Sequence, residues 1–210
     1  MFKTGVSDQT QSNLAALAKV DFVSNYYLAG GTATALHLGH RLSFDLDFFS
    51  QSQAKPETIK SRLSDLGQLE VFQNDEGTFN GSLNDIKLSF FLYDYPLLNP
   101  PESYQGIKIA HLFDIGCMKL DAVSSRGTRR DFVDLYFIAQ KHPLGELLEL
   151  FNKKYPDAPT AHILKSLVYF SDAEQDPPLT MLVPLDWPAV KTFFQSEVKR
   201  LAKDWGLVGE

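Results

Sequence analysis

Two aspartates, Asp45 and Asp47, stand one residue apart in the segment RLSFDLDFF, residues 41–49. The alternation of polar and apolar residues in this segment predicts a β-strand. Side chains at i and i+2 of a strand project from the same face, so both carboxylates would converge on one point. Two like charges held so close are costly unless a cation neutralises them. Hard oxygen ligands favour Mg²⁺ or Mn²⁺, which commonly also bind substrate phosphates. We therefore expect Mg²⁺ (or Mn²⁺) on this pair.

A glycine pair lies upstream of the two aspartates. The apolar run YYLA, residues 26–29, predicts a short strand that leads into Gly30 and Gly31. The following TATALHLG, residues 32–39, predicts a helix that stops at its glycine. Glycine lets a phosphate approach the backbone closely, and the free N–H groups at a helix start favour anions. We therefore expect Gly30 and Gly31 to hold phosphate, while Thr32 either contacts phosphate or caps its helix.

Each of these features also has a simpler interpretation. Glycine pairs are usual in turns, and an Asp-x-Asp pair at a strand edge is commonly just solvated. Their combination, in this order and beside apolar strands, favours a nucleotide site, in which Arg41 would reach a phosphate or screen the aspartates. Two other enzyme classes use paired aspartates. A haloacid-dehalogenase-like phosphatase requires Thr or Val where Phe48 stands, and a nucleotide-sugar glycosyltransferase lacks the preceding glycines and helix.

A second charged cluster lies in residues 111–138, HLFDIGCMKLDAVSSRGTRRDFVDLYFI. Lys119 and Arg126 are seven residues apart, so they lie along one face of a helix that Gly127 would end. The next helix begins with a Thr and has an acid, Asp131, three residues later. This spacing is typical of an N-terminal capping box.

Asp134 follows Asp131 on the same face of that second helix. Two helices joined by so short a turn should pack antiparallel, which would bring Lys119 and Arg126 near both acids. The simplest interpretation of Asp131 is that it caps its helix. However, this many charges among apolar helix faces exceed what capping requires.

The elements divide the chain into an α/β front and a helical back. We predict helices at 8–20, 32–39, 56–66, 112–126, 130–141, 144–154, 158–170 and 188–204, and strands at 26–29, 41–49, 68–73, 77–83, 86–93 and 106–110. A hairpin turn is expected at Asn84-Asp85. The predicted fold class is α/β (α+β), a mixed sheet with flanking helices followed by a C-terminal helical domain. The expected domains are 1–110, the catalytic core, and 111–210, which completes the cleft.

The segments GGTATALHLGHRLSFDLDFF and 111–138 resemble the AbiEii/AbiGii-type toxin family of the nucleotidyltransferase superfamily. These are bacterial and archaeal proteins, many encoded beside an antitoxin or in phage-defence loci. The resemblance implies an enzyme that moves a nucleotide from a nucleoside triphosphate onto an acceptor, which in characterised members is RNA such as tRNA. It also implies that Lys119 and Arg126 bind the nucleotide and that an acid of the segment RDFVD, residues 130–134, supports the active site; this acid is Asp131 or Asp134, and Asp131 is preferred. The expected catalytic residues are then Asp45, Asp47, Lys119 and Asp131.

One feature departs from this pattern. Many enzymes of this fold use a third carboxylate from a neighbouring strand, which we would expect near Ser89 in the strand 86–93. Asp85 and Asp94 stand only at the ends of that strand. A site with one metal ion is therefore expected. The alternative is a catalytically impaired module of the same fold that binds nucleotides or another protein.

Composition narrows the remaining possibilities. The chain has 210 residues, 44% of them hydrophobic and 22% charged, which is typical of a globular protein. The net charge of −6 argues against broad non-specific binding to nucleic acid but allows a local basic patch. A single cysteine, Cys117, excludes an intrachain disulfide and a cysteine-rich zinc site. No apolar stretch approaches the roughly 20 residues of a membrane span, and the first ten residues do not resemble a secretory signal. We expect a cytoplasmic protein.

Overall fold

The computed structural model describes residues 1–52 and 54–206. The chain divides into two compact units, Met1–His111 and a second that begins at Leu112. In the described part of the first unit, seven strands form one sheet in the order β3-β4-β5-β2-β1-β7-β6. The strands are β1 Tyr27–Ala29, β2 Leu46–Ser50, β3 Leu69–Asp75, β4 Thr78–Leu83, β5 Ile86–Leu92, β6 Glu102–Tyr104 and β7 Ile107–Ile109. Because β5-β2 and β1-β7 are parallel and the other pairs antiparallel, the expected mixed sheet is confirmed.

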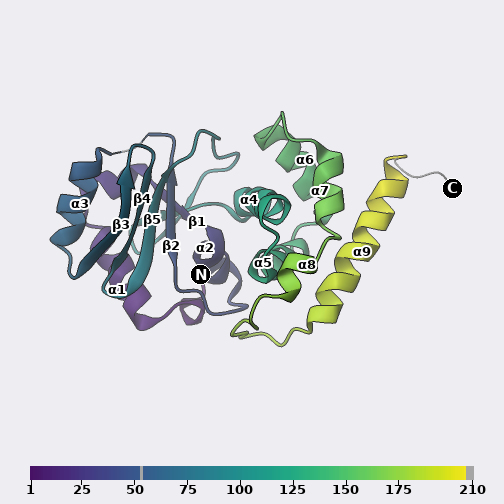
Figure 1. Cartoon of the computed structure of the whole chain (residues 1–210), viewed down its shortest axis with the longest axis horizontal. Helices are drawn as coiled ribbons and strands as arrows, with labels where there is room; N and C mark the ends of the chain where they lie inside the picture. The colour runs from purple at the N-terminus through teal and green to yellow at the C-terminus, as the bar shows by residue number, and fades with distance from the viewer. Residues whose placement is uncertain (53, 207–210) are drawn as a thin grey trace. The chain divides into compact units, whose positions relative to one another are not determined.

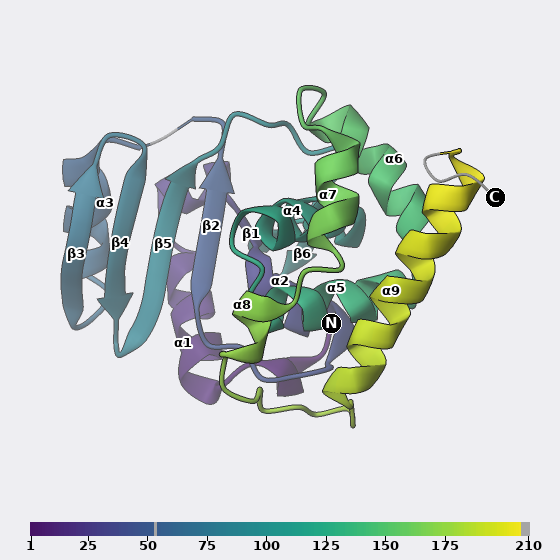
Figure 2. The ribbon, with the colours of Figure 1, turned by 45° about the vertical axis from the view of Figure 1, so that its right-hand side comes forward.

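Helices α1 (Asp8–Leu17) and α3 (Pro56–Ser64) lie on one side of this sheet, as Figure 2 shows. The sheet residues that alternate toward the core include Phe48 of β2 and Phe90 of β5, both fully buried and stacked with ring centroids 5.0 Å apart. The period-2 alternation thus gives the sheet a buried apolar face and leaves the opposite face for other side chains. Asp47 lies on that opposite face.

The start of the strand in the aspartate segment differs from the prediction. Strand β2 begins at Leu46, so Asp45 precedes the strand instead of lying within it. The backbone N–H of Ser43 donates to the carbonyl of Gly5 at 2.9 Å, so this part of the chain bonds to the N-terminal segment and not to the sheet. As a result Phe44 is 51% exposed and lies outside the core.

Three other elements also differ from the prediction. Helix α2 spans Gly30–Leu38 and therefore includes both glycines of the pair. Strand β6 was not predicted; it forms a hairpin with β7 through a turn at Gln105 and Gly106, both with positive φ. The helix expected at 158–170 is shorter, because α7 spans Thr160–Ser166 and a separate helix α8 spans Ser171–Glu174. The turn expected at Asn84-Asp85 is confirmed, since both residues have positive φ.

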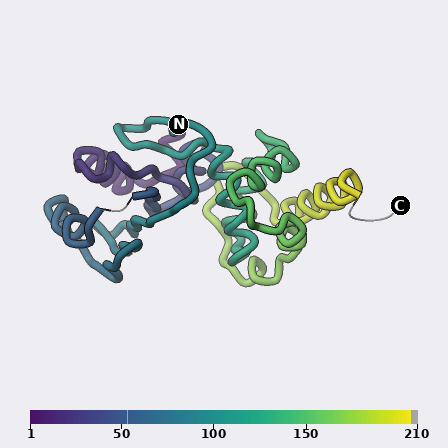
Figure 3. Tube along the Cα trace, turned by 90° about the horizontal axis from the view of Figure 1, so that it is seen from above, coloured from purple at the N-terminus to yellow at the C-terminus, as the bar shows by residue number. Residues whose placement is uncertain are grey.

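The second unit is helical, as expected, and is shown with its helices labelled in Figure 1. It contains α4 Leu112–Ser125, α5 Arg129–Ala139, α6 Leu144–Lys154, α7, α8 and α9 Trp187–Asp204. Figure 3 shows α9, in yellow, as one unbroken helix. The fully buried ring of Phe132 on α5 contacts Phe170, Trp187 and Phe194, with centroids 5.1 to 6.0 Å apart. This aromatic cluster joins α5 to α9 and forms part of the core of the second unit.

None of the helices in the described ranges combines the length and the hydropathy that a membrane span requires.

Candidate active site

The start of α2 brings Asp47 and Arg41 to the glycine pair. Gly30 has a φ of +68°, which favours glycine, and a Cβ added there would lie 3.1 Å from the Oδ2 atom of Asp47. A Cβ on Gly31 would lie 2.5 Å from the Nη2 atom of Arg41. Any larger residue would therefore displace these two side chains. Glycine is favoured at position 30 by the positive φ, and a larger residue at position 31 would push the Arg41 guanidinium away from the helix start.

Thr32 connects α2 to the other aspartate. Its side chain is buried, with 1% of the residue exposed, and its hydroxyl donates to the backbone carbonyl of Asp45 at 2.5 Å. The same oxygen lies 2.9 Å from the Oγ atom of Ser43. The residue that precedes the helix is Ala29, and no side chain caps it. The capping alternative for Thr32 is therefore wrong, and its hydroxyl holds the backbone just before β2.

The sheet places Ser89 directly beside Asp47. The two residues are partners in the parallel pairing of β2 with β5, and Ala29 is the partner of Asp47 on the other side. Ser89 therefore occupies the position where a third carboxylate was expected. Asp85 lies in the hairpin turn instead. Within residues 1–52 and 54–206, no group of three or more His, Cys, Asp or Glu side chains could hold a metal ion. Among the described residues, the two aspartates therefore belong to no such group of three acids.

A row of aromatic side chains lies on the same face of the sheet as the second aspartate. The ring of Phe49 is 6.1 Å from that of Tyr27, 5.4 Å from that of Phe91 and 5.4 Å from that of Tyr93, centroid to centroid. Tyr93 in turn lies 5.4 Å from Tyr95, which is 43% exposed. Sequence reasoning missed this row, although the alternation of β2 and β5 contained the signal.

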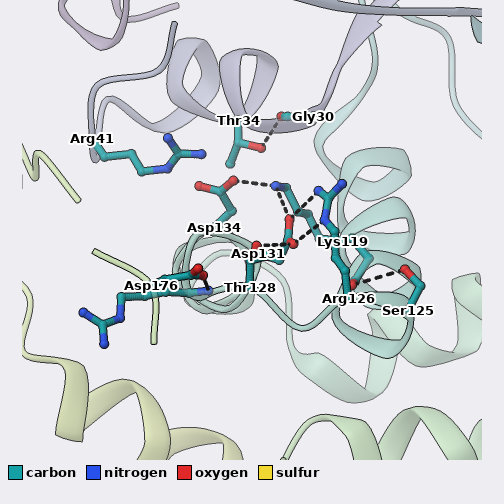
Figure 4. Close-up of polar contacts among 12 residues, drawn as sticks. Gly30, Thr34, Arg41, Lys119, Ser125, Arg126, Thr128, Asp131, Asp134 and Asp176 are labelled. Atoms are coloured by element: carbon teal, nitrogen blue, oxygen red, sulfur yellow. Dashed lines mark hydrogen bonds and ion pairs between the residues drawn. The ribbon is translucent and has the colours of Figure 1, made fainter. Parts of the chain in front are cut away.

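In the second unit, Asp131 is the centre of a buried charged cluster, shown in Figure 4. Its carboxylate is fully buried and accepts hydrogen bonds from three side chains. Lys119 donates at 3.0 Å, Arg126 donates through Nε at 2.8 Å and through Nη2 at 2.9 Å, and Thr128 donates at 2.6 Å. The contact of α4 with α5 thus brings together the residues that the helix pattern indicated.

Lys119 bridges both acids of this cluster. Its Nζ atom lies 3.0 Å from Asp131 Oδ1 and 2.6 Å from Asp134 Oδ2, and only 3% of the residue is exposed. Burial by itself raises the pKa of the Asp131 carboxyl. The positive charges of Lys119 and Arg126 and the hydrogen bond from Thr128 outweigh that effect, so the pKa lies well below its ordinary value. Asp131 is therefore ionised at neutral pH.

The capping box expected at the start of α5 does not form. Thr128 is the N-cap residue, but its side chain makes no bond to the backbone of the first turn and donates to Asp131 instead. The reason is that the Asp131 carboxylate lies between two cations, and hydrogen bonds to a charged group are the stronger ones.

A second buried ion pair joins α4 to α6 and was not expected from the sequence. The Nζ atom of Lys154 lies 3.0 Å from Asp114 Oδ1, and both side chains have no exposed surface. Burial and the nearby Asp114 carboxylate raise the pKa of the adjacent Cys117 thiol to about 12. The two charged residues are 40 positions apart, so no local pattern could have paired them.

The amino-acid sequence matches a known family over nearly its whole length. The family model for the nucleotidyl transferase AbiEii toxin of type IV toxin–antitoxin systems matches residues 13–206. The chain belongs to the AbiEii nucleotidyltransferase toxin family. An uncharacterized protein of Aquifex aeolicus, aq_aa25, is 38% identical over 192 residues, which cover 89% of this chain and 92% of that protein.

Solved structures share the fold of this AbiEii-family chain. MenT4, a nucleotidyltransferase toxin from Mycobacterium tuberculosis, has a TM-score of 0.58 at 14% identity and covers 91% of this chain and 84% of its own. JHP933 from Helicobacter pylori has a TM-score of 0.53 at 20% identity, covering 96% and 97%. The antibiotic-resistance factor ANT(2″)-Ia has a TM-score of 0.55 at 16% identity, covering 70% and 92%. The expected nucleotidyltransferase fold is confirmed.

The family membership establishes the general activity of this chain. The chain is a nucleotidyltransferase of a toxin family, which implies a nucleoside triphosphate as substrate and an antitoxin as partner. Enzymes of this class generally use divalent metal ions. The resemblance seen in the glycine-aspartate segment and in residues 111–138 is thereby confirmed.

Proposed function

We propose that this AbiEii-family nucleotidyltransferase uses Mg²⁺ or Mn²⁺ to transfer a nucleotide from a nucleoside triphosphate onto RNA. The observation that carries the proposal is the first turn of α2. There the Asp47 carboxylate lies against Gly30, and the hydroxyl of Thr32 holds the backbone of Asp45. Two acids and a helix start without side chains therefore belong to one small region of the first unit.

The donor set of this region fits a hard divalent cation. Asp45 and Asp47 supply only carboxylate oxygens, the ligands that Mg²⁺ and Mn²⁺ prefer. A bound ion would neutralise charge on the triphosphate and orient it. The backbone N–H groups of Gly30 and Gly31 favour phosphate oxygens at the helix start, and the guanidinium of Arg41 beside Gly31 adds a cation there.

In the second unit, Lys119 and Arg126 would bind oxygens of the triphosphate. An ammonium group has three N–H donors. In the described part of the chain, Lys119 gives two of them to Asp131 and Asp134, which leaves the third for a phosphate oxygen. Asp131 acts as a positioning residue in this proposal, because it holds both Lys119 and the guanidinium of Arg126 in place.

The aromatic row supports an acceptor that carries bases. Successive residues on one face of a strand are two positions apart, or about 6.6 Å, so Phe49 lies close to Asp47 on β2. Aromatic side chains stack on nucleobases and contribute about 1–3 kcal/mol per base, largely without regard to sequence. Tyr93 and Tyr95 extend this row toward the surface. We infer that the acceptor end of an RNA stacks here.

The test is incorporation of each α-³²P-labelled nucleoside triphosphate into total RNA by the purified protein with Mg²⁺. The Asp45→Asn and Asp47→Asn variants should lose labelling by several orders of magnitude. The matched control is Asp65→Asn, the same change at an exposed position after α3, and it should label like wild type. Labelling that survives the double Asp45→Asn, Asp47→Asn change would show that the assignment of these acids is wrong.

A second measurement separates metal binding from catalysis. Mn²⁺ titration followed by electron paramagnetic resonance should show a bound ion in wild type and Asp65→Asn, but not in the double variant. If Mn²⁺ and nucleotide bind to wild type while no RNA is labelled, the protein is the impaired binding module and the proposed transfer is rejected.

A further inference from the structure

The second unit contains a polar cavity that, apart from Arg126 at its edge, shares no residue with the groups proposed to bind the triphosphate. It has a volume of about 400 Å³ and lies between the end of α4 and helix α7, which contact each other. Three of its lining residues are basic in type, Arg126, His162 and Lys165. Among the described residues, neither the Lys165 ammonium nor the His162 ring has a hydrogen-bond or ion-pair partner, and both residues are exposed. A lysine ammonium without a partner and an imidazole that can donate a hydrogen bond, both lining one cavity, indicate an anionic ligand.

Tyr169 forms a wall shared by this cavity and a second one. The second cavity has a volume of about 550 Å³ and extends along the start of α9, where Pro188 and Lys191 line it. Tyr169 is 57% exposed and makes no ring contact with another aromatic side chain in residues 1–52 and 54–206. A large ring held at the surface between two hollows can stack on a flat partner.

The lining of the first cavity matches one nucleotide of a polynucleotide better than it matches a triphosphate. Ser124 places a hydroxyl group beside the basic residues, and a hydroxyl group can donate a hydrogen bond to a phosphate oxygen. The Asp172 carboxylate also lines the cavity, and it would repel a chain of three phosphates. The same carboxylate can accept a hydrogen bond from a ribose 2′-hydroxyl.

We propose that these two adjoining cavities bind one nucleotide of a single-stranded acceptor RNA. Its phosphate lies against Lys165 and His162, and its base stacks on Tyr169. This proposal rests on the proposed function, in which the acceptor is RNA. Because the whole chain has a net charge of −6, binding of a polyanion requires such a local basic site. Arg126 would link the site to Asp131, with which it forms two hydrogen bonds.

The test is binding of a fluorescent single-stranded oligoribonucleotide to the full chain, without nucleotide or metal, over a series of salt concentrations. Lys165→Glu should weaken binding at least about tenfold and reduce the salt slope by about one contact. Tyr169→Leu should weaken it roughly 5- to 150-fold, and Tyr169→Phe should retain it. The matched control is Lys199→Glu, the same charge change at an exposed position on α9, which should change the affinity less than twofold by the same principle.

Two outcomes overturn the proposal. One is oligoribonucleotide binding by Lys165→Glu equal to that of wild type, or weakened no more than by Lys199→Glu. The other is an increased KM for the nucleoside triphosphate in Lys165→Glu with unchanged oligoribonucleotide affinity, which would assign the cavity to the triphosphate. Because Lys165→Glu leaves the two aspartates of the first unit intact, Mn²⁺ binding remains in this variant. The failure of this proposal is therefore distinguishable from failure of the metal site.

Discussion

Asp131→Asn removes the central charge of the cluster on α4 and α5 while keeping the shape of the side chain. The wild-type carboxylate is fully buried and accepts four hydrogen bonds from Lys119, Arg126 and Thr128. The amide presents an N–H₂ group toward those donors and leaves two cations without their shared anion. Breaking a buried ion pair by changing one partner costs about 3–5 kcal/mol. We expect the free energy of unfolding of the second unit to fall by that amount.

The assay is urea unfolding followed by tryptophan fluorescence. The chain has two tryptophans, Trp187 and Trp205, and both belong to the second unit, so the signal reports that unit. The matched control is Asp204→Asn, which breaks an exposed 3.0 Å pair with Arg200 on α9. Exposed pairs contribute about 0–1 kcal/mol. A loss in Asp131→Asn no larger than in this control would refute the reasoning.

Acidification provides an independent check on the same variant. The pKa of Asp131 is lower in the folded protein than its ordinary value of 3.8, so its contribution to stability is complete above that value. The contribution disappears as the pH falls toward the lower folded pKa. The difference in unfolding free energy between wild type and Asp131→Asn should therefore be constant near neutral pH and shrink below about pH 4. A difference that grows on acidification would contradict the assigned direction of the pKa shift.

Three further predictions concern other parts of the molecule. Lys154→Met leaves the Asp114 carboxylate buried without its 3.0 Å partner and should lower the free energy of unfolding, measured in urea, by about 3–5 kcal/mol. Adding Asp114→Asn to the same chain should recover part of that loss. The Cys117 thiol, with its pKa raised to about 12, should not react with a maleimide or disulfide reagent in native protein at neutral pH, and should react at once in urea. Ser89→Asp places an acid beside Asp47 and should lower the melting temperature of the metal-free protein. Added Mn²⁺ should reverse this effect. Destabilisation that Mn²⁺ does not reverse counts against a metal site on this face of the sheet.

The spacing of neighbouring residues was sufficient to predict much of the candidate site. The glycine pair and the two aspartates lie within one strand-helix-strand segment, so the turn, the helix and the side-chain alternation follow from neighbouring residues. Likewise, Lys119 and Arg126 share a helix face, and one tight turn at Gly127 leads to Asp131. The helical second unit and the contact of the basic side chains with Asp131 were predicted for this reason, whereas the mixed sheet was expected from the resemblance to the nucleotidyltransferase fold.

Only the tertiary structure decided the pairings between distant positions. The position of Ser89 beside Asp47 depends on the register of two strands whose paired residues are more than forty positions apart in the chain. The bond from Thr32 to the backbone of Asp45 arises because β2 starts later than the alternation suggested. The buried pair of Lys154 with Asp114 joins two helices. Periodicity within a segment shows which face a side chain occupies, whereas its partner across the core depends on packing of the whole chain.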